Sequence, residues 1–318
     1  MHQVELERVG LRDEESQLEA EFVPGAGMLC CSLRHRGEEL LAQNAGVDAY
    51  AQVGKTMAIP LLYPWANRLA AFDYTAAGRT VSVPRDPSRV RTDGNGLPIH
   101  GVIGGRQVWE LSDAPGSDGD ALAARLSWSE ERPELFEVFP FRHDLRYRAR
   151  LRDGRLEIEV TVEACGADPV PISFGFHPYL SPPGPPREEW RVELPAMRAL
   201  ALDAQQIPVG PAQEQAAERF ALDAREFDDG FDRVVEPARF SVAAGGRRLE
   251  LTFLEGYRCA QVFAPGGGQF ICFEPMTAPA NALRSGEGLR VLAPGERYAA
   301  RFSVGVGDSC PDGLIRLR

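Results

Sequence analysis

The segment Arg155–Glu163 reads RLEIEVTVE, and it decides the fold class of this 318-residue chain. Its even-numbered positions are apolar and its odd-numbered positions are polar, which is the period of an antiparallel strand with one buried face. Residues 145–151 alternate in the same way, and the turn residues Asp153-Gly154 separate the two segments. The pattern therefore predicts a β-hairpin that lays one face on the core.

Strand-like segments of this kind recur along the whole chain. Alternation returns at 248–253 and 301–304, and short apolar runs lie at 28–33, 80–83, 261–263 and 270–273. Glycine- and proline-rich turns separate them, and strands do not alternate with helices. We therefore predict an all-β protein, a large antiparallel β-sandwich in one domain over residues 1–318. The one fair helix candidate is the alanine-rich segment 211–226, with an ordered loop as its alternative.

Composition argues against nucleic-acid binding, membrane association and a disulfide or zinc framework. The formal charge is −11 and the arginines are dispersed, which argues against nucleic acid as a partner. No apolar run is long enough to cross a bilayer, and residues 1–5 show no signal pattern, so we expect no membrane association and a cytoplasmic protein. The six cysteines lack disulfide or zinc spacing and are expected to be buried thiols.

Motifs for nucleotide cofactors, serine hydrolysis and zinc proteolysis are missing from the sequence. The acidic cluster Phe227–Asp232 lacks the spacing and the bidentate glutamate of a calcium loop. We therefore predict neither a metal nor a cofactor.

His177 closes the apolar segment Ser173–His177 and stands directly before Pro178. In an extended chain the two phenylalanines of this segment face the core, while its small residues share the other face with His177 and leave space over the imidazole. Pro178 keeps the backbone of His177 extended. The simpler interpretation is a hydrogen-bonded histidine at the rim of the fold, and the pattern also fits a catalytic imidazole.

Glu274 has the same setting, because it ends the apolar run 270–273 and stands directly before Pro275. The simpler interpretation is a strand-end carboxylate paired with an arginine. A carboxylate and an imidazole that are both fixed before prolines at the ends of strands can also form an acid/base pair.

Two further segments carry candidate ligand-binding residues. Residues 63–68 (YPWANR) combine aromatic rings with the amide of Asn67 and the guanidinium of Arg68, a mixture that suits sugars. A turn around a packed Trp65 explains the same segment equally well. His100 stands beside Gly101 and is either a ligand contact or part of a structural turn.

The order and separation of these segments resemble the aldose 1-epimerase (galactose mutarotase) family. The resemblance covers nearly the whole chain and is carried by residues 25–41, 60–68, 99–101, 139–141, 174–179, 274–282 and 292–296. It implies a β-sandwich of the galactose-mutarotase type and a cofactor-free interconversion of sugar anomers.

The resemblance also implies roles for individual residues. Glu274 matches the general base and His177 the general acid. Arg68 and His100 match positions that orient the ligand. Asp228 matches a carboxylate that holds sugar hydroxyls, with Asp229 and Asp232 as competing positions.

Two departures from the family pattern leave the sugar open. His100 is followed by Gly101-Val102, where the best-known members have two glycines, and His177 leads into Pro178-Tyr179-Leu180. The prediction is an aldose 1-epimerase that acts on a free monosaccharide, with its oligomeric state undecided.

Two alternatives remain beside this prediction. One is an epimerase for hexose 6-phosphates, which needs basic residues around the pocket, such as Arg68 with Lys55 or Arg106. The other is a sugar-binding module that keeps the sandwich without turnover.

Overall fold

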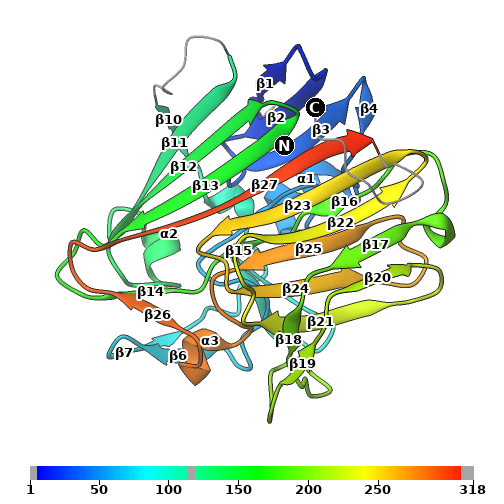
Figure 1. Cartoon of the computed structure of the whole chain (residues 1–318). Helices are drawn as coiled ribbons and strands as arrows, with labels where there is room; N and C mark the ends of the chain where they lie inside the picture. Colours follow the sequence, from blue (N-terminus) through cyan, green and yellow to red (C-terminus); the bar gives the residue numbers. More distant parts are fainter. Residues whose placement is uncertain (1–5, 113–118, 309–318) are drawn as a thin grey trace.

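The computed structural model is built almost entirely from antiparallel sheets (Figure 1). It describes residues 6–112 and 119–308, and within them every pairing between named strands is antiparallel. The predicted all-β sandwich is confirmed. One cluster of buried apolar residues joins the three larger sheets, whereas the single domain over residues 1–318 stays a prediction.

The largest sheet has nine strands, and the C-terminal strand β27 runs through its middle, between β13 and β23 (Figure 1). Its strands, in spatial order, are β10 (Glu110–Ser112), β11 (Ala121–Trp128), β12 (His143–Arg152), β13 (Arg155–Glu163), β27 (Arg297–Asp308), β23 (Arg247–Glu255), β22 (Ala238–Ala244), β17 (Arg191–Leu194) and β20 (Glu218–Ala221).

The second sheet, of eight strands, carries the candidate site residues. In order it contains β19 (Gln213–Gln215), β18 (Met197–Ala199), β21 (Phe227–Asp232), β24 (Cys259–Ala264), β25 (Ile271–Met276), β15 (Gly175–Phe176) and β5 (Leu61–Leu62), and β16 (Tyr179–Leu180) also pairs with β25.

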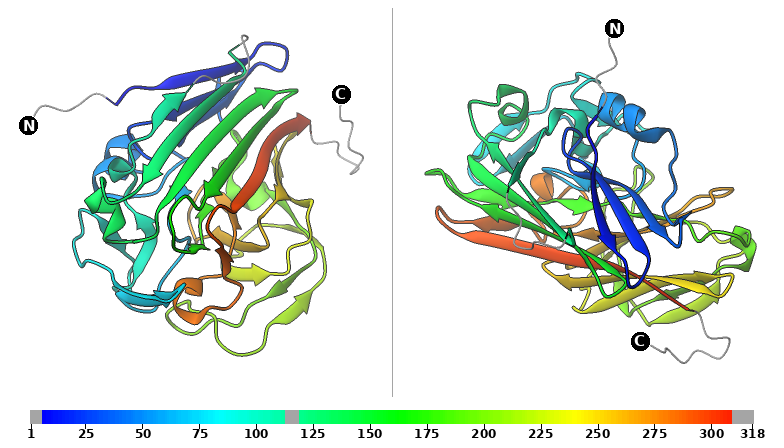
Figure 2. Two further views of the ribbon diagram at one scale, coloured as in Figure 1. Left: turned by 90° about the vertical axis from the view of Figure 1, so that its left-hand side faces the viewer. Right: turned by 90° about the horizontal axis from the view of Figure 1, so that it is seen from above.

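A smaller N-terminal sheet lies beside the nine-stranded one, where β1 and β2 contact β12 (Figure 2). It consists of β1 (Val9–Asp13), β2 (Leu18–Val23), β3 (Leu29–His35) and β4 (Glu38–Glu39). The remaining strands form the pairs β6 (Asp73–Ala76) with β7 (Arg79–Ser82), β8 (Val90–Thr92) with β9 (Pro98–Val102), and β14 (Val170–Ile172) with β26 (Arg290–Leu292).

The helices of the described residues are short. They are α1 (Gly46–Val53), α2 (Pro133–Phe136), α3 (Ala282–Ser285) and the 3₁₀ turns η1 (Gly104–Arg106) and η2 (Arg187–Glu189). None of them has the length and hydrophobicity required to span a lipid bilayer.

The hairpin predicted from residues 145–163 is present as β12 and β13. The turn residues Asp153 and Gly154 both have positive φ angles, 53° and 69°, as a two-residue turn between twisted strands requires. The even-numbered side chains of β13 are fully buried and the odd-numbered ones are partly exposed. The alternation in the sequence therefore gave the correct buried face.

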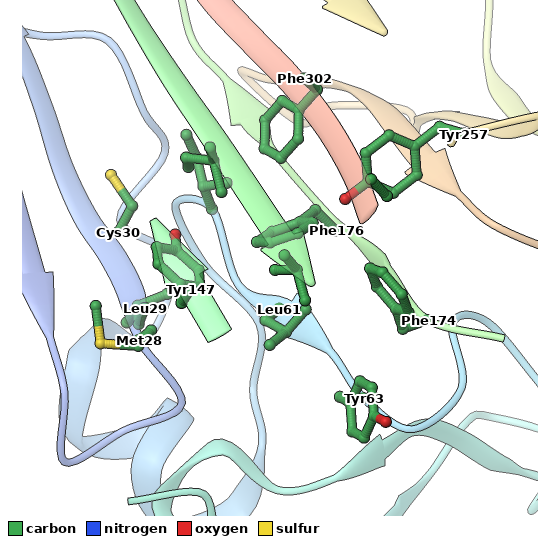
Figure 3. Packing of buried hydrophobic residues seen from close by; sticks show 14 of the residues in the cluster. Met28, Leu29, Cys30, Leu61, Tyr63, Tyr147, Phe174, Phe176, Tyr257 and Phe302 are labelled. Carbon is green, nitrogen blue, oxygen red and sulfur yellow. The ribbon is translucent and has the colours of Figure 1, made fainter. Parts of the chain in front are cut away.

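Aromatic side chains fill the space between the two large sheets (Figure 3). Phe176 from the eight-stranded sheet lies between Tyr147 and Phe302 of the nine-stranded sheet, with ring centroids 6.3 and 4.9 Å away. Phe174 contacts Tyr257 in the same layer, at 6.2 Å. Both phenylalanines of segment 173–177 thus face the core, as the sequence predicts.

Three expectations from the sequence were wrong. Residues 211–226 form no helix; β19 and β20 lie there, because pairing with β18 and β17 overrides the helix propensity of the alanines. Glu274 is inside β25 and not at its end, since the strand continues to Met276. Cys165 is exposed, whereas the other four cysteines in the described residues are buried and all five are free; Cys310 lies outside those residues.

Candidate active site

All six ligand-binding and catalytic candidates from the sequence line one pocket. Its volume is about 230 Å³, and strands β16, β21, β24 and β25 of the eight-stranded sheet contribute lining residues. The six are Asn67, Arg68, His100, His177, Asp228 and Glu274. Residues from five separate parts of the chain thus converge on one cavity.

Strand register places His177 opposite Glu274. On either side of His177, Gly175 pairs with Met276 and Tyr179 pairs with Cys272. Both pairs belong to one antiparallel register, in which residue 177 faces residue 274. The Nε2 atom of His177 lies 3.3 Å from Oε1 of Glu274.

The backbone around this pair is fixed from the other edge as well. The amide of His177 donates to the carbonyl of Pro60 at 3.2 Å, and the amide of Tyr179 donates to Ala58 at 2.8 Å. Pro178 and Pro275 have no amide hydrogen, so each of them interrupts the hydrogen-bond ladder next to a functional side chain.

The two side chains are buried and incompletely hydrogen-bonded. His177 is 5% exposed and Glu274 is 2% exposed. Within the described residues, Nδ1 of His177 and Oε2 of Glu274 have no hydrogen-bond partner, and Nδ1 of His100 in the same pocket has none either. Because buried polar atoms are normally paired, three such atoms in one pocket indicate groups that are built to meet a ligand.

Burial changes the acidity of both groups in opposite directions. It raises the pKa of Glu274 well above its usual value, with a further contribution from Asp228, while Arg68 opposes it. It lowers the pKa of His177 to about 3. Each group is therefore driven toward its neutral form, and the pair holds one proton over a wide pH range.

Tyr179 fixes the orientation of the His177 ring. The two rings are stacked, with centroids 4.3 Å apart and planes within 4°. The tyrosine hydroxyl is held by Thr56 Oγ1 at 2.6 Å and lies 3.4 Å from Nε2 of His177. A rigid aromatic surface beside the imidazole limits its rotation.

Three hydrogen bonds and one ion pair connect four further side chains of the pocket. Arg68 donates to Asn67 Oδ1 at 2.9 Å, and Asn67 donates to Gln261 Oε1 at 3.2 Å. Gln261 donates to Asp228 Oδ1 at 2.7 Å, and Arg68 lies 3.5 Å from Asp228 Oδ2. The Nε of Arg68 also donates to Asp93 at 2.7 Å. These side chains are thus ordered before any ligand arrives.

Asp228 is the aspartate of its cluster that faces the pocket. Asp232 instead forms an ion pair with Arg198, 2.6 Å between Nε and Oδ1. Asp229 does not line the cavity, and burial raises its pKa. The prediction for Asp228 as a pocket residue therefore agrees with the geometry.

His100 reaches the cavity because its backbone is left-handed, with φ of 65°. Its ring meets that of His177 edge-on at 5.4 Å, and burial lowers its pKa well below the usual value. At Gly101 a Cβ atom would lie 2.1 Å from the carbonyl oxygen of Tyr63, so only glycine allows this close approach.

Comparison with known proteins agrees with the family resemblance found in the sequence. Residues 14–305 match the family described as Aldose 1-epimerase.

The chain belongs to the aldose 1-epimerase family.

One curated protein and two solved structures are among those similar to this chain. Over 251 residues the chain is 24% identical to the uncharacterized protein YihR of Escherichia coli K12, covering 77% of each. The structure of the Slr1438 protein from Synechocystis sp. PCC 6803 is 24% identical with a TM-score of 0.76, covering 97% of this chain and 100% of the other. A galactose mutarotase-like protein from Clostridium acetobutylicum is 15% identical with a TM-score of 0.80, covering 96% and 99%. At these identities the likeness is one of fold.

Some details of the pocket differ from the sequence interpretation. Trp65 is fully buried in the core and offers no platform; Tyr179 and Phe263 are the aromatic residues of the pocket. Gly175 leaves no open space, since a Cβ there would lie 2.6 Å from the carbonyl oxygen of Pro275.

Several lining residues were not found from the sequence. Lys55 and Arg106, considered there as basic neighbours, do not line the cavity, whereas Arg91 and Asp93 do. Gln261 was missed because its role depends on pairing with Glu274 across β24 and β25, which no local pattern reveals.

Proposed function

We propose that this protein is an aldose 1-epimerase that interconverts the α and β anomers of a monosaccharide. The observation that carries the proposal is the opposed pair His177 and Glu274, 3.3 Å apart in a buried pocket. The two oxygens on the anomeric carbon of a sugar are bonded to the same atom. Two side chains at this separation can therefore each engage one of them.

Ring opening in this scheme moves two protons. Glu274 takes the proton of the O1 hydroxyl, and the electron pair of that bond forms the C1=O1 carbonyl. The C1–O5 bond breaks, its electron pair stays on O5, and O5 receives a proton from the His177 imidazolium. Rotation about the C1–C2 bond presents the other carbonyl face, and reclosure reverses both transfers.

The charge of the pair stays at zero throughout. Before opening, the proton of the pair is on His177; after opening, it is on Glu274. Since a low-dielectric site penalises net charge, both halves of the reaction avoid that cost. Burial favours neutral Glu274 and neutral His177. This is the protonation state from which the ring closes, with the proton of the pair on Glu274.

The surrounding residues would hold the sugar during this exchange. Arg68, Asn67, Gln261 and Asp228 offer donors and acceptors for hydroxyl groups. Burial keeps His100 neutral, so its imidazole has one donor and one acceptor to offer. The scheme uses only side chains of this chain.

Polarimetry with freshly dissolved α-anomer tests the proposal. The wild type should accelerate the approach to equilibrium, and His177→Asn should lose about 10²- to 10⁴-fold of that acceleration. Thermal denaturation of both proteins with and without sugar is the companion measurement. A sugar-induced rise in Tm without any acceleration by the wild type would refute catalysis and favour a binding module.

A further inference from the structure

Arg91 is a pocket cation that has no carboxylate partner among the described residues. Its Nη1 donates to the carbonyl of Gly54 at 3.3 Å. Across residues 6–112 and 119–308, no carboxylate oxygen lies within 4.0 Å of its guanidinium nitrogens. The contrast with Arg68 is clear, because Arg68 in the same pocket contacts both Asp93 and Asp228.

Asp93, the acidic residue nearest to Arg91 in sequence, already accepts hydrogen bonds at both of its carboxylate oxygens. Asp93 accepts the Arg68 guanidinium at one carboxylate oxygen and the amides of Asn95 and Leu97, both at 2.9 Å, at the other. The Asp93 side chain is only 6% exposed, and its existing hydrogen bonds hold it toward Arg68 and not toward Arg91. The guanidinium donors of Arg91 that do not meet Gly54 are thus available to a ligand.

Arg91 belongs to the histidine side of the pocket. Arg91 lies on β8 and pairs with Ile99 of β9, the residue directly before His100. Beyond the larger effect of burial, the charges of Arg91 and Arg68 both lower the pKa values of His100 and His177, whereas Arg91 is not among the charges that shift the pKa of Glu274. Glu274 instead receives the charges of Asp228 and Arg68. The pocket is therefore polarised, with free positive charge near His177 and negative charge near Asp228.

We propose that Arg91 is a specificity residue that binds an anionic group on the sugar, and that the preferred substrate is an aldose with a single negative charge at C6. The inference rests on the proposed function. In a pyranose, C6 is attached to C5, which is bonded to the ring oxygen that His177 would protonate. A substituent at C6 therefore extends on the side of O5, where Arg91 lies.

The charge of the pocket favours a monoanion over a dianion. One unpaired guanidinium can neutralise one negative charge, and its forked donors suit a carboxylate or a sulfonate. Asp93 and Asp228 line the same cavity and would repel a second negative charge.

The test compares four sugars by anomer exchange, followed by polarimetry or NMR. The probes are glucose, glucuronate, 6-deoxy-6-sulfoglucose and glucose 6-phosphate, with the wild type, Arg91→Gln and Arg91→Lys. Arg106→Gln is the matched control, since Arg106 is an exposed arginine outside the pocket that contacts Ser88.

For the wild type we expect kcat/KM for at least one monoanion to exceed that for glucose by about 10- to 100-fold, the worth of a charge-assisted hydrogen bond. Arg91→Gln should lower kcat/KM for the preferred monoanion by about 10- to 100-fold more than it lowers kcat/KM for glucose, Arg91→Lys should keep part of the preference, and Arg106→Gln should leave the preference unchanged. Comparing kcat/KM for glucuronate and for 6-deoxy-6-sulfoglucose shows whether the site prefers a planar carboxylate or a tetrahedral sulfonate.

Equal losses of Arg91→Gln on glucose and on the monoanions would overturn the inference, as would a wild type with no preference for either monoanion. A preference for glucose 6-phosphate over both would refute the single charge. If no sugar is turned over, the proposed function fails separately. Calorimetry then measures binding of the same probes. Weaker binding of a monoanion by Arg91→Gln than by the wild type supports Arg91 as the anion-binding residue, and unchanged binding refutes that role.

Discussion

Replacing Glu274 by glutamine removes the proton acceptor of the proposed reaction while keeping the size of the side chain. The amide cannot take the O1 proton, so the catalysed rate should fall by about 10²- to 10⁴-fold, or about 3–5 kcal/mol in the activation free energy. The fold should persist, since Oε2 of Glu274 has no hydrogen-bond partner among the described residues that glutamine could forfeit.

The same substitution should raise stability at neutral pH. Burial raises the pKa of Glu274 in the folded state above the ordinary 4.5. The stability contribution of this carboxyl is then fully present below about pH 4.5 and is lost as the pH rises toward the folded-state pKa, by about 1.4 kcal/mol per pH unit. Glutamine does not titrate, so the variant should gain relative to the wild type between pH 4.5 and 8.

Polarimetry measures the first effect and thermal denaturation at pH 4.5 and 8 measures the second. Glu157→Gln is the matched control, because Glu157 is a half-exposed partner of Arg301 far from the site in sequence and sheet. Wild-type activity in the Glu274 variant would refute its role as base. A stability difference that does not grow with pH would refute the buried, proton-retaining carboxyl.

Four further outcomes follow from the site. The pH–rate profile should have its acid limb well below pH 6.5, because burial lowers the pKa of His177 to about 3, and its alkaline limb set by the raised pKa of Glu274; an acid limb near 6.5 would contradict this. Asp228→Asn should move the alkaline limb to lower pH, since the Asp228 charge raises the pKa of Glu274; an unmoved limb speaks against that coupling. Tyr179→Ala should reduce kcat by roughly tenfold by freeing the imidazole, whereas Tyr179→Phe keeps the stack and most activity; equal rates for both would exclude the stacking role. Gly101→Ala should destabilise the fold by at least about 2 kcal/mol in chemical denaturation, and an unchanged midpoint would refute the steric argument.

The fold class was readable from the sequence because a sheet with one buried face imposes a period of two on its residues. Residues 155–163 carry that period without exception, and the turn at Asp153-Gly154 fixes the hairpin. Segment 211–226 was misread because its state is decided by strands β17 and β18, which lie outside the segment. Local propensity carries no information about such partners.

Six of the pocket residues could be named from the sequence, but their arrangement and the other lining residues could not. Each of His177 and Glu274 stands before a proline, which marks it as a special position. That they face one another depends on the pairing of β15 and β16 with β25. Arg91 carries no local signal at all, since its proposed role rests on its having no ion-pair partner within the part of the chain that the structure describes. The cytoplasmic location stays a prediction, and the oligomeric state stays open.

The shared register of residues 175–179 and 272–276 limits how the family can vary in length here. Insertion of one residue between Gly175 and His177 would turn the imidazole toward the aromatic core and a neighbouring phenylalanine into the pocket. Insertion of two would restore the face but displace His177 from Glu274 by about 6–7 Å along the strand. Loops elsewhere can lengthen freely, whereas these two short segments must keep their residue count for the acid and the base to meet.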